Sequence, residues 1–139
     1  MYEKFVMTTP PVLPQDVTSD AIKRIAFMDN TLIEDAPYFE AVWCLKDIPV
    51  GPARHTHDFD EYLGYMGIDP TTDALGCTVE IEVGDELLTM TKNFIMRIPA
   101  GVPHCPMRVL NLTRPVINYS GGPNIQYLRT HMDGSKRVD

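Results

Sequence analysis

The sequence lacks the features of a nucleic-acid-binding or membrane protein. Its 139 residues carry 12 Lys and Arg against 19 Asp and Glu, a formal net charge of −7, whereas phosphate binding needs a clustered basic surface. No apolar run approaches the roughly 18 residues that span a bilayer. The N-terminal stretch MYEKFVMTTPPVLP has no long apolar core of a secretory signal. We therefore expect a cytoplasmic protein with neither nucleic-acid nor membrane partners.

Cysteine is scarce and its spacing forms no motif. Cys44, Cys77 and Cys105 are odd in number and contain no CxxC pair, which argues against a disulfide framework. Free buried thiols in a reducing compartment are the simplest interpretation, in agreement with a cytoplasmic location. Cys105 stands out only because it adjoins His104.

Long helical patterns are also missing. No apolar stripe with a 3.6-residue period extends beyond about two turns, and 12 prolines and 9 glycines imply many turns. In contrast, TVEIEV at 78–83 alternates cleanly between apolar and polar residues, the pattern of a half-buried strand. Other short strands are expected at 23–28, 38–48, 61–66, 86–90, 93–99, 105–110, 115–120 and 124–129. Length and pattern together predict one all-β domain over residues 1–139.

The two ends of the chain are expected to differ from this body. Residues 1–20 include TTPPVLPQDV and predict an extended arm, because prolines disfavour a helix. The arm is expected to lie either across its own barrel or against a partner subunit. Residues 130–139 predict a flexible tail in which His131 is structural or solvated.

The stretch HTHDFDE holds two of the four histidines. Side chains at i and i+2 of a strand share a face, so we expect His55 and His57 to project together and converge on one ion. Two imidazoles with the nearby carboxylate of Glu61 suit divalent transition metals rather than calcium or magnesium. Asp58 and Asp60 face away by the same parity and are expected to be turn residues or acceptors for an imidazole N–H.

A second stretch, IPAGVPH at 98–104, supplies a third imidazole. Its proline and glycine describe a tight turn that feeds a strand beginning at His104. Gly101 provides a backbone position with positive φ, and Pro103 fixes the approach to the histidine. His104 is thereby placed to meet the first two histidines across a barrel.

HTH-x3-E together with P-x-G-x2-H resembles the two motifs of the cupin superfamily. The resemblance covers residues 51–104 and implies a small antiparallel jelly-roll β-barrel, a single bound metal ion and, since many cupins pair through their sheets, a homodimer. Four positions depart from the family pattern. Gly51 lies closer to the first histidine and Gly67 closer to the glutamate than usual, Asn93 replaces a glycine, and Arg108 replaces an asparagine. Carried over position by position, the implied metal ligands are His55, His57, Glu61 and His104.

Two residues are candidates for contact with a substrate. Counted by two from Glu61 and from His104, the side chains of Tyr65 and Arg108 point into the barrel. Tyr65 is a candidate base. An interior arginine needs an anion, which favours a small anionic metabolite as substrate. In the alternative, Arg108 pairs with a surface acid, and the sequence leaves both open.

The expected function is that of a metal-dependent enzyme acting on a small molecule. The ligand set accommodates Fe, Mn, Ni, Zn or Cu, so it does not select the ion. Iron would indicate a dioxygenase, and the other ions an isomerase, lyase or decarboxylase in which the metal polarises a carbonyl or enolate. A non-catalytic module that binds a small molecule through its metal is the further alternative, because one fold hosts many activities.

Overall fold

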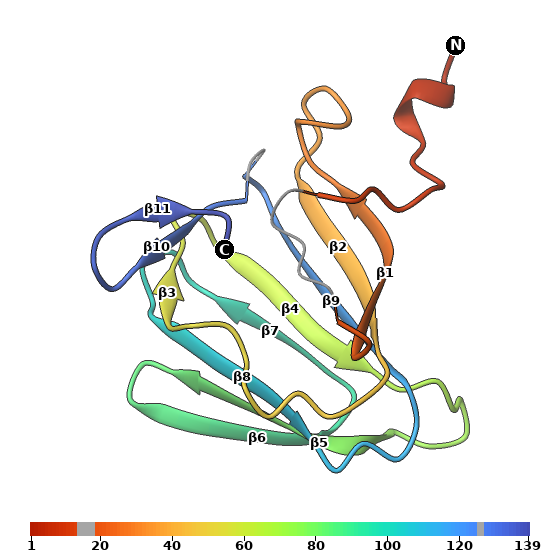
Figure 1. Cartoon of the computed structure of the whole chain (residues 1–139), viewed down its shortest axis with the longest axis vertical. Coiled ribbons are helices and arrows are strands. Elements are labelled where there is room, and N and C mark those ends of the chain that lie inside the picture. Colours follow the sequence, from red (N-terminus) through yellow and green to blue (C-terminus); the bar gives the residue numbers. More distant parts are fainter. Residues whose placement is uncertain (14–18, 125–126) are drawn as a thin grey trace.

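The computed structural model describes residues 1–13, 19–124 and 127–139. Figure 1 shows its strands in two antiparallel sheets that face each other. One sheet has the order β1 (Ile22–Met28), β2 (Tyr38–Cys44), β9 (Val116–Gly122), β4 (Glu61–Met66) and β7 (Phe94–Ile98). The other has the order β11 (Lys136–Arg137), β10 (Arg129–His131), β3 (His55–Thr56), β8 (His104–Leu110), β5 (Ala74–Val83) and β6 (Glu86–Lys92).

The all-β class is confirmed, and the chain forms a jelly roll because it crosses between the sheets at most connections. In the described part of the chain the one helical element is the 3-10 turn Glu3–Phe5, and no helix is long and apolar enough to cross a membrane. The strand expected at 124–129 lies later, as β10; residues 125–126 are outside the described part.

The core lies between the two sheets, because alternate residues of each strand face inward. Leu63 and Ile98 of the five-stranded sheet pack with Ile81 of the six-stranded sheet. A second cluster combines Leu75, Val79, Val109 and Val116, each at most 1% exposed, with partly polar neighbours such as Tyr65. These contacts hold the sheets at the spacing that the site between them requires.

The C-terminal residues and part of the N-terminal arm lie against this body, whereas residues 1–6 are exposed and the N-terminus projects away from the sheets (Figure 1). Residues 130–139, expected as a flexible tail, instead contribute to the hairpin of β10 and β11, and β10 pairs with β3. In the N-terminal arm a carbonyl, that of Pro11, accepts a hydrogen bond of 3.1 Å from Arg24 Nη1, and Leu13 packs on a cluster around Phe27 and Tyr38. The arm therefore crosses its own chain; residues 14–18 of the expected arm lie outside the described part.

Replacing a residue that joins the two sheets should destabilise the fold. Ile81 is fully buried, so Ile81→Ala removes apolar contacts from both sheets and is expected to lower the free energy of unfolding by about 3 kcal/mol. Leu87 on neighbouring β6 is 55% exposed, and Leu87→Ala should change it by less than about 0.5 kcal/mol. Urea unfolding measures both, and equal effects would contradict this placement of the core.

Candidate metal centre

One cross-strand pair joins the two sequence motifs. β3 and β8 are antiparallel with His55 directly opposite His104, so both side chains lie on one face and their rings are 4.5 Å apart. The His57 ring, just beyond β3, lies 4.9 Å from that of His55 and 5.2 Å from that of His104. All three residues are at most 2% exposed. The three predicted imidazoles therefore form one buried cluster.

Glu61 brings a carboxylate to this cluster from the facing sheet. It is the first residue of β4, and its Oε1 lies 3.4 Å from His57 Nε2 and 3.3 Å from His104 Nε2. The hydroxyl of Tyr38 donates a 3.3 Å hydrogen bond to the other carboxylate oxygen. Burial raises the pKa of this phenol well above its ordinary value, with a further rise from the charge of Glu61, so Tyr38 stays a donor.

Backbone carbonyls fix the orientation of each imidazole ring. The Nδ1 atoms of the three histidines lie 2.6 Å, 2.6 Å and 3.0 Å from the carbonyl oxygens of Ala53, Leu128 and Val102. A carbonyl only accepts, so each Nδ1 carries the proton and each Nε2 presents a lone pair. Burial, the largest cause, lowers the pKa of His55 to about 3 and keeps its ring neutral.

The donor atoms fit a divalent transition metal. Nε2 of His57 and of His104 is buried without a hydrogen-bond partner, which is unfavourable for a polar atom. Both lone pairs face the same oxygen of Glu61. The lone pairs and the carboxylate repel one another unless a cation lies between them. The donor atoms of these three residues lie within 4.8 Å of one another. Neutral imidazoles oriented through Nδ1, with one carboxylate, are typical of such metal sites.

Cys105 is a further candidate metal ligand, which the resemblance to the two motifs does not imply. Its Sγ and one nitrogen each of His55 and His104 also lie within 4.8 Å of one another, so the two groups share His104. Burial raises the pKa of the Cys105 thiol to about 12, which keeps it protonated when no ion is bound. Its adjacency to His104 was the only signal of this position in the sequence.

The turn before His104 is held by the first motif. Gly101 has a φ of 82°, as predicted, and its N–H donates a 2.9 Å hydrogen bond to the carbonyl of His57. Asp60 accepts a 3.0 Å hydrogen bond from the Ala100 N–H. Asp58 forms an exposed ion pair 3.0 Å from Lys136. Asp60 therefore holds the turn and Asp58 lies at the surface. In the described part of the chain neither aspartate accepts a hydrogen bond from an imidazole.

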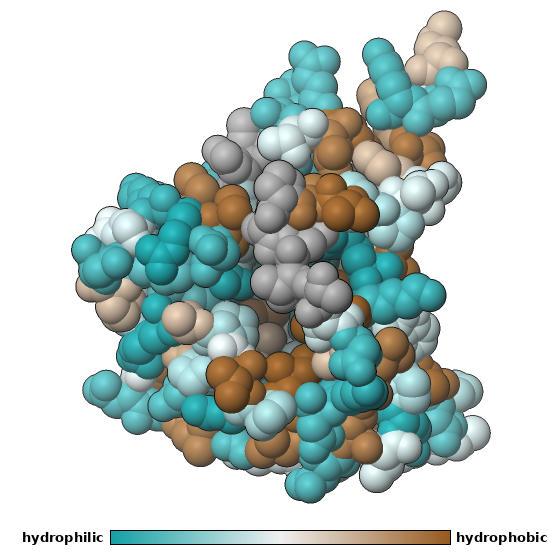
Figure 2. Space-filling view, in the orientation of Figure 1, coloured by the Kyte–Doolittle hydropathy of each residue, from teal (hydrophilic) through white to brown (hydrophobic). Residues whose placement is uncertain are grey.

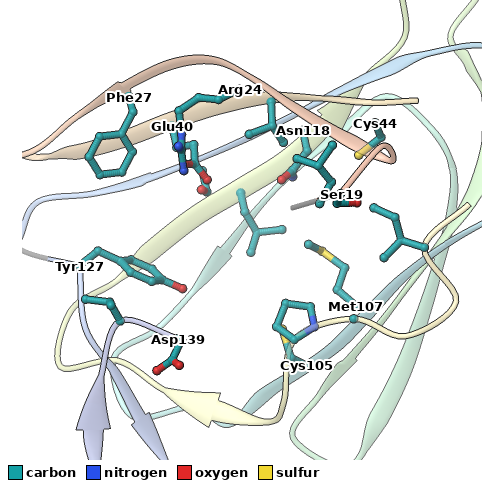
Figure 3. Close-up of a pocket in the computed structure, with 18 of the residues that line it drawn as sticks. Ser19, Arg24, Phe27, Glu40, Cys44, Cys105, Met107, Asn118, Tyr127 and Asp139 are labelled. Carbon is teal, nitrogen blue, oxygen red and sulfur yellow. The ribbon is translucent and has the colours of Figure 1, made fainter. Parts of the chain in front are cut away.

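A cavity of about 690 Å³ opens beside the cluster, and His55 and Glu61 line it. In the close-up of Figure 3, Arg24 and Glu40 lie together on one side of the cavity, and Met107 and Cys105 lie on another. Figure 2 shows a hollow on the face seen in Figure 1, with hydrophobic residues along its lower edge. The metal candidates thus border a space large enough for a small molecule.

The two predicted substrate-facing residues have different outcomes. Tyr65 points inward as expected and lines the cavity, but burial raises its pKa well above the ordinary value, so its phenol stays protonated and is not a base. Arg108 is not among the cavity residues, and its Nη2 lies 3.7 Å from Glu82 Oε2. Cys105 and Met107 face the cavity instead, because a φ of 76° at Cys105 shifts the alternation of β8 by one residue. Of the two alternatives open for Arg108, the inward position is therefore wrong, and the pairing with a surface acid is the one observed.

Three further residues of the cavity were not singled out from the sequence. Tyr127 and Arg129 reach it from the C-terminal region, where only a strand at 124–129 was expected, and Arg24 reaches it from β1. Their approach depends on strand pairing between distant parts of the chain, which no local motif announces.

Comparison with known proteins shows the fold. No family model and no curated protein matches the chain. Among solved structures, a mutant of Bacillus subtilis oxalate decarboxylase is 13% identical with a TM-score of 0.55 over 84% of this chain and 29% of that one. Oxalate oxidase in complex with glycolate is 10% identical, with a TM-score of 0.53 over 88% and 61%. Peruvianin-I, a cysteine peptidase from Thevetia peruviana latex, is 11% identical, with a TM-score of 0.58 over 100% and 79%.

These likenesses, at low identity, concern the fold alone. They agree with the two antiparallel sheets and with the jelly roll that the motif resemblance implied. The expected jelly-roll fold is confirmed, while the reaction and the ion are not determined by it.

Removing one imidazole of the cluster should remove the metal. His104→Ala eliminates the histidine that both donor groups share, and we expect the metal content of the purified protein to fall from about one ion per chain to near zero. His131 is also buried but belongs to neither donor group, so His131→Gln is the matched control and should keep the ion. Elemental analysis measures both, with circular dichroism to verify folding. A wild-type protein that resists loading with Fe, Mn, Ni and Zn would contradict the site.

Proposed function

We propose that this cupin-fold protein is a metal-dependent enzyme that acts on a small anionic metabolite, as a dioxygenase when the ion is iron. The observation that carries the proposal is the set of buried, unpaired imidazole nitrogens facing Glu61 at the wall of a 690 Å³ cavity. A site with unused donors beside a space for a ligand is typical of metal catalysis rather than of a closed structural metal site.

The proposed ligands are His55, His57, Glu61 and His104. A bound ion would supply Lewis acidity and, in the case of iron, redox chemistry. The protein's part is orientation: backbone carbonyls hold the imidazole rings, and Tyr38 holds one oxygen of Glu61. Tyr65, a protonated phenol of the cavity wall, remains the proposed substrate-facing residue predicted from the sequence, as a donor of a hydrogen bond.

We further propose that the protein is a cytoplasmic homodimer. Three free, buried cysteines support a reducing compartment. The outer face of the five-stranded sheet supports a dimer, since its outward residues are largely apolar and several are well exposed: Phe39 48%, Tyr62 42%, Met66 42% and Ile95 66%. Such a face can pair with its own copy around a two-fold axis.

Oxygen consumption tests the proposed reaction. Protein loaded with Fe(II) without air should consume oxygen when one of a panel of diols, diketones, thiols and organic acids is added, and His104→Ala should not. An oxygen electrode records the rate. Silence across the panel, together with melting shifts that depend on both the ion and a panel member, would contradict the dioxygenase and indicate a non-oxidative enzyme or a binding module.

Sedimentation velocity tests the dimer. The wild-type protein should sediment at the mass of two chains at micromolar concentration, and Ile95→Lys should sediment as one chain, because it places a charge in the apolar face. Leu87→Lys is the control, since Leu87 is similarly exposed at 55% but lies on β6 of the other sheet. A wild-type monomer, or equal effects of both variants, would contradict the proposed interface.

A further inference from the structure

We infer that Arg129 binds the carboxylate of the substrate, and that the substrate is a small organic acid with a short apolar body. The inference deepens the proposed function and rests on it, since it assigns a ligand to the cavity beside the same centre. It concerns a residue outside both sequence motifs.

Arg129 lies in β10 and lines the cavity close to the candidate metal centre. Its Nε donates a 2.7 Å hydrogen bond to the hydroxyl of Tyr127, and its Cζ is 5.5 Å from the centre of that ring. The Tyr127 ring in turn lies 5.1 Å from the ring of His57. One tyrosine therefore bridges the guanidinium and the histidine cluster, and holds the arginine in a fixed orientation.

Arg129 has no ion-pair partner among the residues that the structure describes. No carboxylate in the described part of the chain lies within ion-pair distance of its guanidinium, and its one hydrogen-bonded side chain is a neutral phenol. The other cavity arginine differs: Arg24 Nη2 lies 2.9 Å from Glu40 Oε2. Asp139, which also lines the cavity, is 3.3 Å from Arg137. A half-buried guanidinium with no acid beside it favours an incoming anion.

The other charged side chains that the structure describes in the cavity wall point the same way. Arg24 Nη2 lies 2.9 Å from Glu40 Oε2, Asp139 is paired with Arg137, and the Nε2 atoms of the cluster histidines carry no proton. Glu61 and Arg129 then contribute opposite charges, so a divalent ion would leave the inner cavity with a positive excess. An anionic ligand between the ion and Arg129 reduces that excess, whereas a neutral or cationic ligand does not.

The remaining wall of the cavity fits an apolar body. Ile48, Leu63, Met107 and Val109 line it, with Cys44 and Tyr65 among them. Figure 3 places Tyr127 and Cys44 at opposite sides of the space. A ligand that reaches Arg129 with its carboxylate thus directs its other end toward apolar side chains. A single arginine matches the planar carboxylate in two-point fashion, whereas phosphate sites usually add further cations or backbone N–H groups.

Binding of a matched acid and amide tests the inference. The probes are 2-oxopentanoate and 2-oxopentanamide, titrated into zinc-loaded protein in a calorimeter, because zinc binds without redox turnover. The wild type should bind the acid at least about tenfold more tightly than the amide, the range of one charge-assisted pair. Arg129→Gln should reduce this preference to the part that the zinc ion alone provides, and should weaken the binding of the acid far more than that of the amide. Arg108→Gln is the control, since Arg108 carries the same charge outside the cavity, and should keep the preference.

Arg129→Lys is a second variant, which keeps the inference testable if Arg129→Gln does not fold. It keeps the charge and should retain part of the preference for the acid, with the melting temperature verifying the fold. Equal binding of acid and amide to the wild type, no binding of either, or an unchanged preference in Arg129→Gln would overturn the inference. Tighter binding of inorganic phosphate than of the acid would overturn the carboxylate assignment.

Metal content separates this inference from the proposed function. Arg129→Gln should retain about as much zinc as the wild type by elemental analysis, because Arg129 is not among the donor residues. If the wild type holds no metal, the proposed function fails, and the acid preference in metal-free protein still reports on Arg129. If metal is bound and the preference is absent, the carboxylate assignment alone fails.

Discussion

The antiparallel pairing of His55 with His104 is the contact on which the site depends. β3 is only two residues long and lies between β10 and β8, which fix its register from both sides through His131 and His104. A slip of one residue would turn His55 to the opposite face of the sheet. Gly51 allows the chain to approach: a Cβ there would lie 1.7 Å from the carbonyl oxygen of Met107 on β8. The close contact between the backbones of Gly51 and Met107 thus explains why a glycine stands at position 51.

The same pairing concentrates polar atoms where burial is unfavourable. Two Nε2 atoms without partners face a buried carboxylate oxygen, and such a cluster destabilises the fold unless an ion is bound. The apolar clusters around Ile81 and Val79 contain none of the four candidate ligands, so the core between the sheets is built from other residues. The site is best understood as a local arrangement that stable surroundings hold in place for function.

The β class, and the meeting of His55, His57, Glu61 and His104 in one place, could be predicted because both depend on short-range patterns: alternation within strands, the spacing of the histidines, and a turn that requires positive φ at Gly101. Prediction failed where the backbone departs from regular geometry. At Cys105 a φ of 76° reverses the alternation, and Arg108 faces Glu82 instead of the cavity. It failed also where pairing is long-range. The C-terminal strand β10 joins β3 across more than seventy residues of sequence, and composition alone suggested a tail there.

The candidate metal ligands and the other polar residues of the cavity come from different parts of the chain. The candidate ligands come from the two motifs, on β3, β4 and β8, whereas Arg24, Tyr127 and Arg129 reach the cavity from β1 and the C-terminal region. Glu61 and Arg129 have opposite charges on one cavity without forming an ion pair, which leaves the space between them to a ligand. Proteins of one fold can differ in ligand through the segments that close the cavity, even where the strands that carry the motifs are alike. The residues that would select a ligand of this protein therefore lie near its two ends, whereas the two motifs identify the fold.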